Sequence, residues 1–168
     1  PPRYMALVEL INTPATEPAN LDALETFVTS TLGKGVVRAK DSPNFVANRV
    51  GIAGMLATMK EVANFGLTID VVDDLTGKRL GRASSGTFRT ADVVGLDTLA
   101  HVIHTLQDKL NPQTDPFYAS YATPAVLQTL LDMGHLGQKT GAGFYKKVGR
   151  EVLRFNPFDG SYVSAGQK

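Results

Sequence analysis

The stretch Lys139-Thr140-Gly141-Ala142-Gly143-Phe144-Tyr145, which follows Leu136-Gly137, places two glycines around an alanine and ends in two aromatic residues. Glycine lets a backbone turn tightly and pass close to a neighbouring segment or a ligand. Phe144 and Tyr145 can anchor such a turn in a core, and Lys139 puts a mobile positive charge at its mouth. Taken alone, this pattern is more typical of an ordinary glycine turn than of a binding site.

The composition is that of a globular protein, because 43% of the 168 residues are hydrophobic and 20% are charged. The net charge of +1 favours neither nucleic acid nor a membrane surface as the main partner. The absence of cysteine excludes disulfides and thiolate chemistry and is compatible with a cytoplasmic location. No apolar run has the length of a membrane span. The start, Pro1-Pro2-Arg3-Tyr4, lacks an initiator methionine and is no signal peptide, which predicts a cut end.

The first forty residues have the pattern of a β-α-β crossover. An apolar run over residues 5–11, interrupted by Glu9, predicts a buried strand. Apolar residues then recur at helical spacing, namely Leu21, Leu24, Val28 and Leu32. Gly33 ends this helix, and residues 35–39 predict a second strand, parallel to the first. Two strands are too little sheet to be stable alone, so this segment is predicted to be the tail of a larger α/β domain.

From Asp41-Ser42-Pro43 onward the pattern becomes helical. Ser42 as N-cap and Pro43 in the first turn predict the start of a long helix that Gly66 ends. Further helices are predicted over residues 69–75, 96–110 and 126–133. Loops are predicted over residues 77–89 and 111–121, and a hairpin over residues 152–155 and 161–163. Because each helix has one apolar face, the helices are expected to pack as a bundle.

Two polar side chains interrupt apolar surfaces and are candidates for chemistry. A carboxylate in a buried strand, such as Glu9, is costly unless a partner satisfies it. Glu9 could orient a catalytic imidazole, with an attraction of about 4 kcal/mol at about 4 Å, or it could face solvent at a sheet edge. Asn48 lies on the apolar side of the long helix, where its amide could donate to a substrate carbonyl or bond to a loop backbone.

Other polar residues point to less. Arg79, Arg82 and Arg89 flank a Gly/Ser loop and could contact phosphates, but neither Walker spacing nor a dinucleotide glycine fingerprint accompanies them. A solvated basic loop explains them better. His101 and His104 lie one helical turn apart without a cluster of further ligands, so no metal site is predicted.

Four stretches share one resemblance. They are Pro1-Pro2-Arg3-Tyr4-Met5 through Glu9-Leu10-Ile11; Gly33-Lys34 with Lys40-Asp41-Ser42-Pro43-Asn44-Phe45-Val46-Ala47-Asn48-Arg49-Val50; Thr87-Phe88-Arg89-Thr90-Ala91-Asp92-Val93-Val94-Gly95-Leu96-Asp97; and Leu136-Gly137 through Tyr145. In their order and spacing they resemble the L-3-hydroxyacyl-CoA dehydrogenases of fatty-acid β-oxidation. These enzymes oxidise a 3-hydroxyacyl-CoA to a 3-ketoacyl-CoA with NAD+.

The resemblance implies an NAD-binding Rossmann domain followed by a helical domain, similar to the C-terminal domain of 6-phosphogluconate dehydrogenase, that often forms a homodimer. The expected chain is mainly α: residues 1–41 form the end of the Rossmann domain, residues 42–147 the helical domain, and residues 148–168 a hairpin tail or linker. The family's dinucleotide fingerprint and its catalytic histidine, in a His-Phe-x-Asn-Pro stretch, are not in this sequence. The chain alone is therefore predicted to be inactive.

The resemblance also implies roles for single residues. Glu9 matches the carboxylate that pairs with the catalytic histidine, Asn48 matches the active-site asparagine, and Lys139 matches a lysine that reaches NAD. Asn44 departs from the family, which usually has glycine there, and leaves open how the backbone leads into the long helix. The third stretch and the tail after Tyr145 resemble bacterial forms that are fused to an enoyl-CoA hydratase.

Two other interpretations remain open. The chain could act as an assembly module, because a helical bundle without its sheet partner exposes apolar surface. It could also belong to a related reductase, such as a 3-hydroxybutyryl-CoA dehydrogenase of fermentation or a 6-phosphogluconate-like enzyme. Asn48-Arg49 together with the Lys139 stretch favours the hydroxyacyl-CoA branch.

Overall fold

The computed structural model describes residues 2–166 and divides the chain into two compact units, residues 1–50 and 51–168. Pro1, which opens the first of the four stretches, lies outside the described residues, as do Gln167 and Lys168. None of the helices in the described part is long and apolar enough to cross a membrane. The domain limits predicted at residues 41 and 147 stay predictions.

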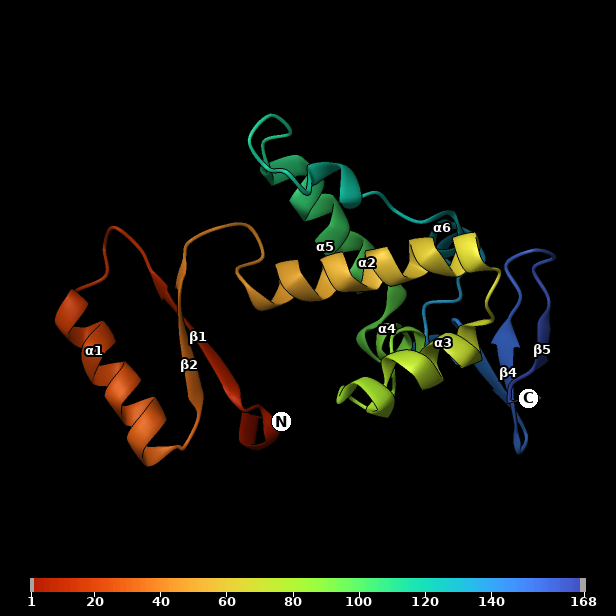
Figure 1. Cartoon of the computed structure of the whole chain (residues 1–168), viewed down its shortest axis with the longest axis horizontal. Coiled ribbons are helices and arrows are strands. Elements are labelled where there is room, and N and C mark those ends of the chain that lie inside the picture. The colour runs from red at the N-terminus through yellow and green to blue at the C-terminus, as the bar shows by residue number, and fades with distance from the viewer. Residues whose placement is uncertain (1, 167–168) are drawn as a thin grey trace. The chain divides into compact units, whose positions relative to one another are not determined.

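The first unit is a β-α-β crossover (Figure 1). Strands β1 (Leu7–Asn12) and β2 (Gly35–Lys40) pair in parallel, with Leu7 opposite Gly35. Helix α1 (Pro18–Thr26), prolonged by a π-helical turn (Phe27–Thr31), connects them. The small core of this unit consists of Leu10, Leu21, Val28 and Ala39. The predicted crossover is confirmed.

Helix α2 (Ala47–Phe65) starts later than the sequence predicts. Ser42 and Pro43 neither cap nor open it, so that expectation was wrong. The reason is the backbone of Asn44 and Phe45, whose positive φ values of 58° and 52° cannot belong to a right-handed helix. Asn44 thus adopts the left-handed conformation that glycine takes more easily, which answers how the chain leads into α2.

The second unit contains the helical bundle. After α2 come α3 (Ile69–Thr76), α4 (Phe88–Val94), α5 (Leu96–Lys109) and α6 (Ala125–Asp132), with single 3-10 turns at Lys78–Leu80, Tyr118–Ser120 and Gln138–Thr140. The most deeply buried aromatic and aliphatic side chains are Phe88, Phe144, Phe155, Leu96, Leu99, Ile103, Leu106, Leu127 and Leu130. The mainly α architecture is confirmed, and α3, α5 and α6 lie within two residues of their predicted limits. Helix α4 was not predicted, and its first two residues were expected to belong to the loop of residues 77–89.

The last residues form an antiparallel three-stranded sheet instead of the predicted two-stranded hairpin. Strand β4 (Glu151–Phe155) pairs with β3 (Tyr145–Val148) on one side and with β5 (Tyr162–Ser164) on the other. Phe155 is 1% exposed, and its backbone N–H donates to the carbonyl of Phe144 at 2.8 Å. This sheet therefore packs on the helical core and helps to hold the turn before β3.

Replacing Phe155 tests whether the sheet is part of the bundle's core. We expect Phe155→Ala to lower the free energy of unfolding by about 3–5 kcal/mol, because a fully buried ring leaves a cavity. The matched control is Phe158→Ala, whose ring is 82% exposed and whose removal should change it by less than about 0.5 kcal/mol. Urea unfolding of both variants measures this. Equal losses in the two variants would contradict the assignment of Phe155 to the core.

Candidate functional site

Glu9 lies on β1 and binds the start of α2. Its carboxylate accepts hydrogen bonds from the backbone N–H groups of Val46 (2.8 Å) and Ala47 (2.9 Å). An anion at the N-terminus of a helix is favoured by the unpaired amides and by the helix dipole. The side chain is half-buried. The structure therefore gives the Glu9 carboxylate a defined position and two hydrogen-bond partners at the start of α2.

Asn48 directly follows the amide that Glu9 binds. Its side chain is exposed, not directed into the apolar side of the helix as the sequence pattern predicts. Within residues 2–166 the side-chain amide of Asn48 makes no hydrogen bond. The structure thus places Asn48 directly after Ala47, whose backbone N–H Glu9 binds, within the first unit.

Lys139 belongs to the second unit and lies on the 3-10 turn Gln138–Thr140. Its ammonium group contacts both carboxylate oxygens of Asp97, at 2.5 and 2.6 Å, at the first turn of α5. The side chains of Lys139 and Asp97 are 48% and 46% exposed. The Lys139 hydrogen bond is the main reason why the pKa of Asp97 is lowered. This ion pair holds the lysine at the surface end of the glycine turn.

The glycine turn is held in place by Asp92 of α4. The Asp92 carboxylate is 4% exposed and accepts the backbone N–H groups of Phe144 and Tyr145, both at 2.8 Å. Gly137 and Gly143 lie so close that a Cβ on either would overlap atoms of Asp92. The glycines of this motif are therefore required by the close approach of the turn to a buried carboxylate.

Asp73 of α3 performs the same function for the start of α4. Its carboxylate accepts the backbone N–H groups of Thr87 (2.8 Å), Phe88 (2.6 Å) and Arg89 (3.0 Å). It also accepts the phenol of Tyr145 at 2.8 Å. Tyr145 consequently joins the two aspartates, since its backbone binds Asp92 and its hydroxyl binds Asp73.

Burial governs the ionisation of this group of residues. Desolvation raises the pKa of Asp92 to about 6, against the lowering effect of its two backbone hydrogen bonds, and the negative charge of Asp73 adds to the rise. Desolvation likewise raises the pKa of Asp73. The pKa of Tyr145 is raised by its burial and by the charge of Asp73, so its hydroxyl stays a hydrogen-bond donor at any physiological pH.

A second hydrogen-bond chain reaches the turn from β5. The hydroxyl of Tyr162 donates to the carbonyl of Gly143 at 2.6 Å and lies 3.0 Å from Nδ1 of His135. A hydroxyl has a single proton, so Nδ1 of His135 carries the hydrogen in that contact. Burial raises the pKa of Tyr162 to about 12. The turn is thus bound through its amides by Asp92 and through a carbonyl by Tyr162.

Asp73 and Asp92 were not predicted as functional residues, although the sequence carries a signal for both. Asp73 is four residues after the buried Ile69, and Asp92 is four residues after the buried Phe88. Both therefore lie on the inward stripe of a short helix, where a carboxylate must find donors. Both aspartates thus carry the same signal as Glu9, a carboxylate on the apolar side of its element.

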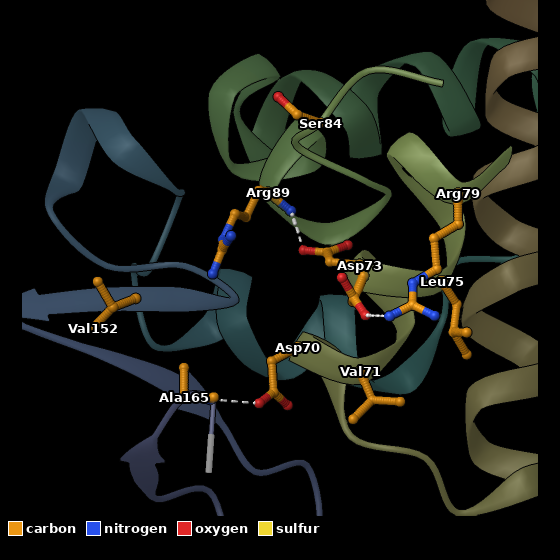
Figure 2. Close-up of a pocket in the computed structure, with 11 residues that line it drawn as sticks. Asp70, Val71, Asp73, Leu75, Arg79, Ser84, Arg89, Val152 and Ala165 are labelled. Carbon is orange, nitrogen blue, oxygen red and sulfur yellow. Dashed lines mark hydrogen bonds and ion pairs between the residues drawn. The ribbon is translucent and has the colours of Figure 1, made fainter. Parts of the chain in front are cut away.

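An open pocket of about 610 Å³ has Asp73 among the residues that line it (Figure 2). Its charged residues are engaged with one another or with neighbours: Arg79 pairs with Asp74 at 3.0 Å, and Asp70 pairs with Arg154 at 3.0 Å. Arg89 lies over the ring of Tyr145, 4.5 Å from its centre. The pocket contains neither Glu9, Asn48 nor Lys139, and it is not the predicted site.

One histidine and two arginines of the basic loop contact other side chains of the protein. His135 contacts Tyr162, and Arg79 and Arg89 are engaged as described above. No group of three or more His, Cys, Asp or Glu side chains suited to a metal ion occurs among residues 2–166.

Comparison with known proteins identifies the family. Residues 45–147 match the family described as 3-hydroxyacyl-CoA dehydrogenase, C-terminal domain. The chain therefore belongs to the 3-hydroxyacyl-CoA dehydrogenase family, which consists of oxidoreductases. The match covers α2 to β3, including the Asp73 and Asp92 contacts and the Lys139 turn.

Individual relatives agree with this assignment. Proteins named as 3-hydroxyacyl-CoA dehydrogenases are 42% identical in Bacillus subtilis, over 96% of this chain and 20% of the relative, and 44% identical in Deinococcus radiodurans, over 92% and 43%. The crystal structure of FadB2 from Mycobacterium tuberculosis superposes with a TM-score of 0.69 at 33% identity, over 87% of this chain and 49% of FadB2. Further relatives are named as fatty acid oxidation complex trifunctional enzymes or as 3-hydroxybutyryl-CoA dehydrogenases. The chain thus spans between about a fifth and a half of the relatives it matches.

Alanine substitution of two turn glycines separates crowding from backbone conformation. Gly137 has φ 99° and lies against Asp92, whereas Gly141 has φ 76° with open space around it. We expect Gly137→Ala to reduce the free energy of unfolding by about 2–4 kcal/mol, from overlap plus an unfavourable backbone angle. Gly141→Ala should cost only about 1–2 kcal/mol, from the angle alone. Urea unfolding of the two variants provides the comparison, and equal losses would show that contact with Asp92 does not require glycine.

Proposed function

We propose that this chain supplies the C-terminal part of an L-3-hydroxyacyl-CoA dehydrogenase, which oxidises the C3 hydroxyl of a 3-hydroxyacyl-CoA to a ketone with NAD+. The family match over residues 45–147 carries the proposal. The remainder of the machinery, an NAD-binding domain with a catalytic histidine, is part of the proposal. This chain joined to, or mixed with, such a domain is called the complete enzyme below.

Glu9 would orient and stabilise the histidine. A carboxylate has about four acceptor positions, and the amides of Val46 and Ala47 use two of them. The others can accept the imidazole N–H. This bond would fix the tautomer in which the opposite nitrogen removes the proton of the substrate hydroxyl, and the negative charge would stabilise the imidazolium that results.

Asn48 would place the substrate oxygen. Its exposed amide can donate a hydrogen bond to the oxygen at C3, which develops carbonyl character as the reaction proceeds. Because Asn48 is next to Ala47, the contact of Glu9 with the helix start also fixes the backbone that carries the amide.

NAD+ supplies the hydride acceptor when it is bound. Lys139 has the properties for a contact with it: the side chain is about half exposed, and its ammonium group carries three donors, of which Asp97 can engage two. At least one donor remains for a polar atom of the cofactor. The sequence offers no glycine fingerprint for the pyrophosphate, which the proposal assigns to the NAD-binding domain.

Complementation tests the assignment of Glu9. We expect no NADH formation from 3-hydroxybutyryl-CoA by this chain alone, and turnover in the complete enzyme. Glu9→Gln should lower kcat of the complete enzyme by roughly 10²–10⁴-fold, the usual worth of a supported general base. Glu17→Gln, which changes an exposed carboxylate of the same unit, is the control and should leave kcat unchanged. Full activity of Glu9→Gln would remove Glu9 from the mechanism, and turnover by the chain alone would remove the need for a separate histidine.

We also propose that the complete enzyme is a cytoplasmic homodimer and belongs to the larger forms that carry an enoyl-CoA hydratase. The names of the trifunctional relatives support the fusion. Large apolar side chains exposed in the second unit support self-association, among them Phe65 (72%), Val93 (61%) and Phe117 (60%).

Sedimentation of this chain tests the dimer. We expect a dimer whose mass does not change with protein concentration, because a native interface buries enough apolar area to persist on dilution. The sedimentation masses of Phe117→Ser and Phe65→Ser should each be compared with that of Phe158→Ser, the control at another exposed position. A heterogeneous series of larger particles would contradict a specific dimer and would favour nonspecific association of uncovered apolar surface.

A further inference from the structure

Asp92 determines where the glycine turn lies. It is the only residue of α4 whose side chain accepts amides of that turn among the hydrogen bonds of the described chain, and it binds two successive ones, Phe144 and Tyr145. Asp92 also contacts both ends of the turn, because a Cβ at Gly137 or Gly143 would overlap its atoms. A shift of Asp92 or a loss of its acceptors must therefore move the turn.

The turn transmits that position to Lys139 because it is closed by its own hydrogen bonds. The N–H of Gly137 donates to the carbonyl of Ala142 at 2.8 Å, and the N–H of Leu136 donates to the hydroxyl of Thr140 at 2.8 Å. Lys139 lies inside this closed segment. Its backbone consequently has little freedom to adjust independently of the residues that Asp92 holds.

The same turn is coupled to the start of α5, where Asp97 holds the Lys139 ammonium group. The N–H of Leu96 donates to the carbonyl of Leu136 at 3.1 Å, and Gly95 alone separates α4 from α5. Asp92 and Asp97 thus position Lys139 from two sides, the first through the backbone and the second through the side chain.

We propose that Asp92 is a positioning residue that fixes Lys139 for its contact with NAD through the closed turn of residues 137–145. This inference rests on the proposed function, since it takes the contact between Lys139 and the cofactor as given. It adds a residue that touches neither substrate nor cofactor and that acts only through Lys139.

A double-mutant cycle in the complete enzyme tests this path. Asp92→Asn keeps the shape but offers one acceptor where two amides must be bound, so KM for NAD+ should rise about tenfold while kcat changes less than about twofold. In the Lys139→Met background the same substitution should cause no further rise in KM. Asp108→Asn, at an exposed position of α5, is the control and should have no effect in either background.

The outcomes separate this inference from the proposed function. If Lys139→Met alone leaves KM for NAD+ unchanged, the cofactor contact itself is refuted. If Lys139→Met raises KM but Asp92→Asn does not, or if Asp92→Asn raises KM by the same factor in both backgrounds, only the positioning role is refuted. The last result would mean that Asp92 acts on the protein as a whole and not through Lys139.

A measurement on the unaltered protein covers the case in which Asp92→Asn fails to fold. Protonation of Asp92 removes one of its acceptor oxygens, and its pKa of about 6 brings this into an accessible range. In the complete enzyme, the amide NMR signals of Phe144 and Tyr145 and the ε-methylene signal of Lys139 should shift together as the pH falls through about 6. KM for NAD+ should rise over the same interval.

Other ionisable groups near Asp92 must be separated from this titration. They are Asp73 on α3, Arg89 on α4, Tyr145 on β3, Tyr162 on β5 and His135, which contacts Tyr162. The pKa of Tyr162 is about 12 and that of Asp97 is lowered, so neither changes charge near pH 6. His135→Gln should leave the joint shift in place. Amides that titrate while the Lys139 signal stays constant would overturn the proposal.

Discussion

The fold of the second unit depends on two buried carboxylates that bind backbone amides. Asp73 accepts three amides at the start of α4, and Asp92 accepts two at the start of β3. Burial is unfavourable for a charged carboxylate, so desolvation raises the pKa of each, and the negative charge of Asp73 adds to the rise for Asp92. The amides compensate for this because each would otherwise be a donor without a partner in the interior. Tyr145 binds both aspartates, so neither contact can be removed without disturbing the other.

The ionisation of Asp92 has a defined sign in the stability of this arrangement. Its pKa in the folded protein is about 6, above the ordinary value of 3.8. The folded state therefore binds the proton more tightly than the unfolded chain. The resulting contribution to stability is complete below about pH 3.8 and is lost as the pH rises through about 6. At neutral pH the protein keeps a charged Asp92 at a cost in stability and gains a turn that is held by two strong hydrogen bonds.

Much of the fold follows from local sequence, and two of the exceptions share one cause. Apolar periodicity predicted α3, α5 and α6 and the β-α-β crossover, because each of these elements carries its own amphipathic pattern. The start of α2 and the whole of α4 were not predicted. In both, the N-terminus is bound by a carboxylate distant in sequence: Glu9 is 37 residues before Val46, and Asp73 is 14 residues before Thr87. A local pattern cannot show that a helix is capped by another element. The start of α2 was therefore predicted too early, with Ser42 as the N-cap.

The candidate site shows the same division between what is local and what is not. The sequence singled out Glu9 as a carboxylate on an apolar strand, and the structure supplies the amides that justify its position. It singled out Lys139 from a glycine motif, but the reason for those glycines is Asp92, more than forty residues earlier. Glycine motifs next to a charged residue are often attributed directly to ligand binding. Here the glycines are explained by contact with a buried carboxylate, and the proposed contact with the cofactor belongs only to the lysine that the turn carries. A substitution at Gly137 or Gly143 would therefore act first on the packing against Asp92, and under the proposed function it would reach the cofactor only through the position of Lys139.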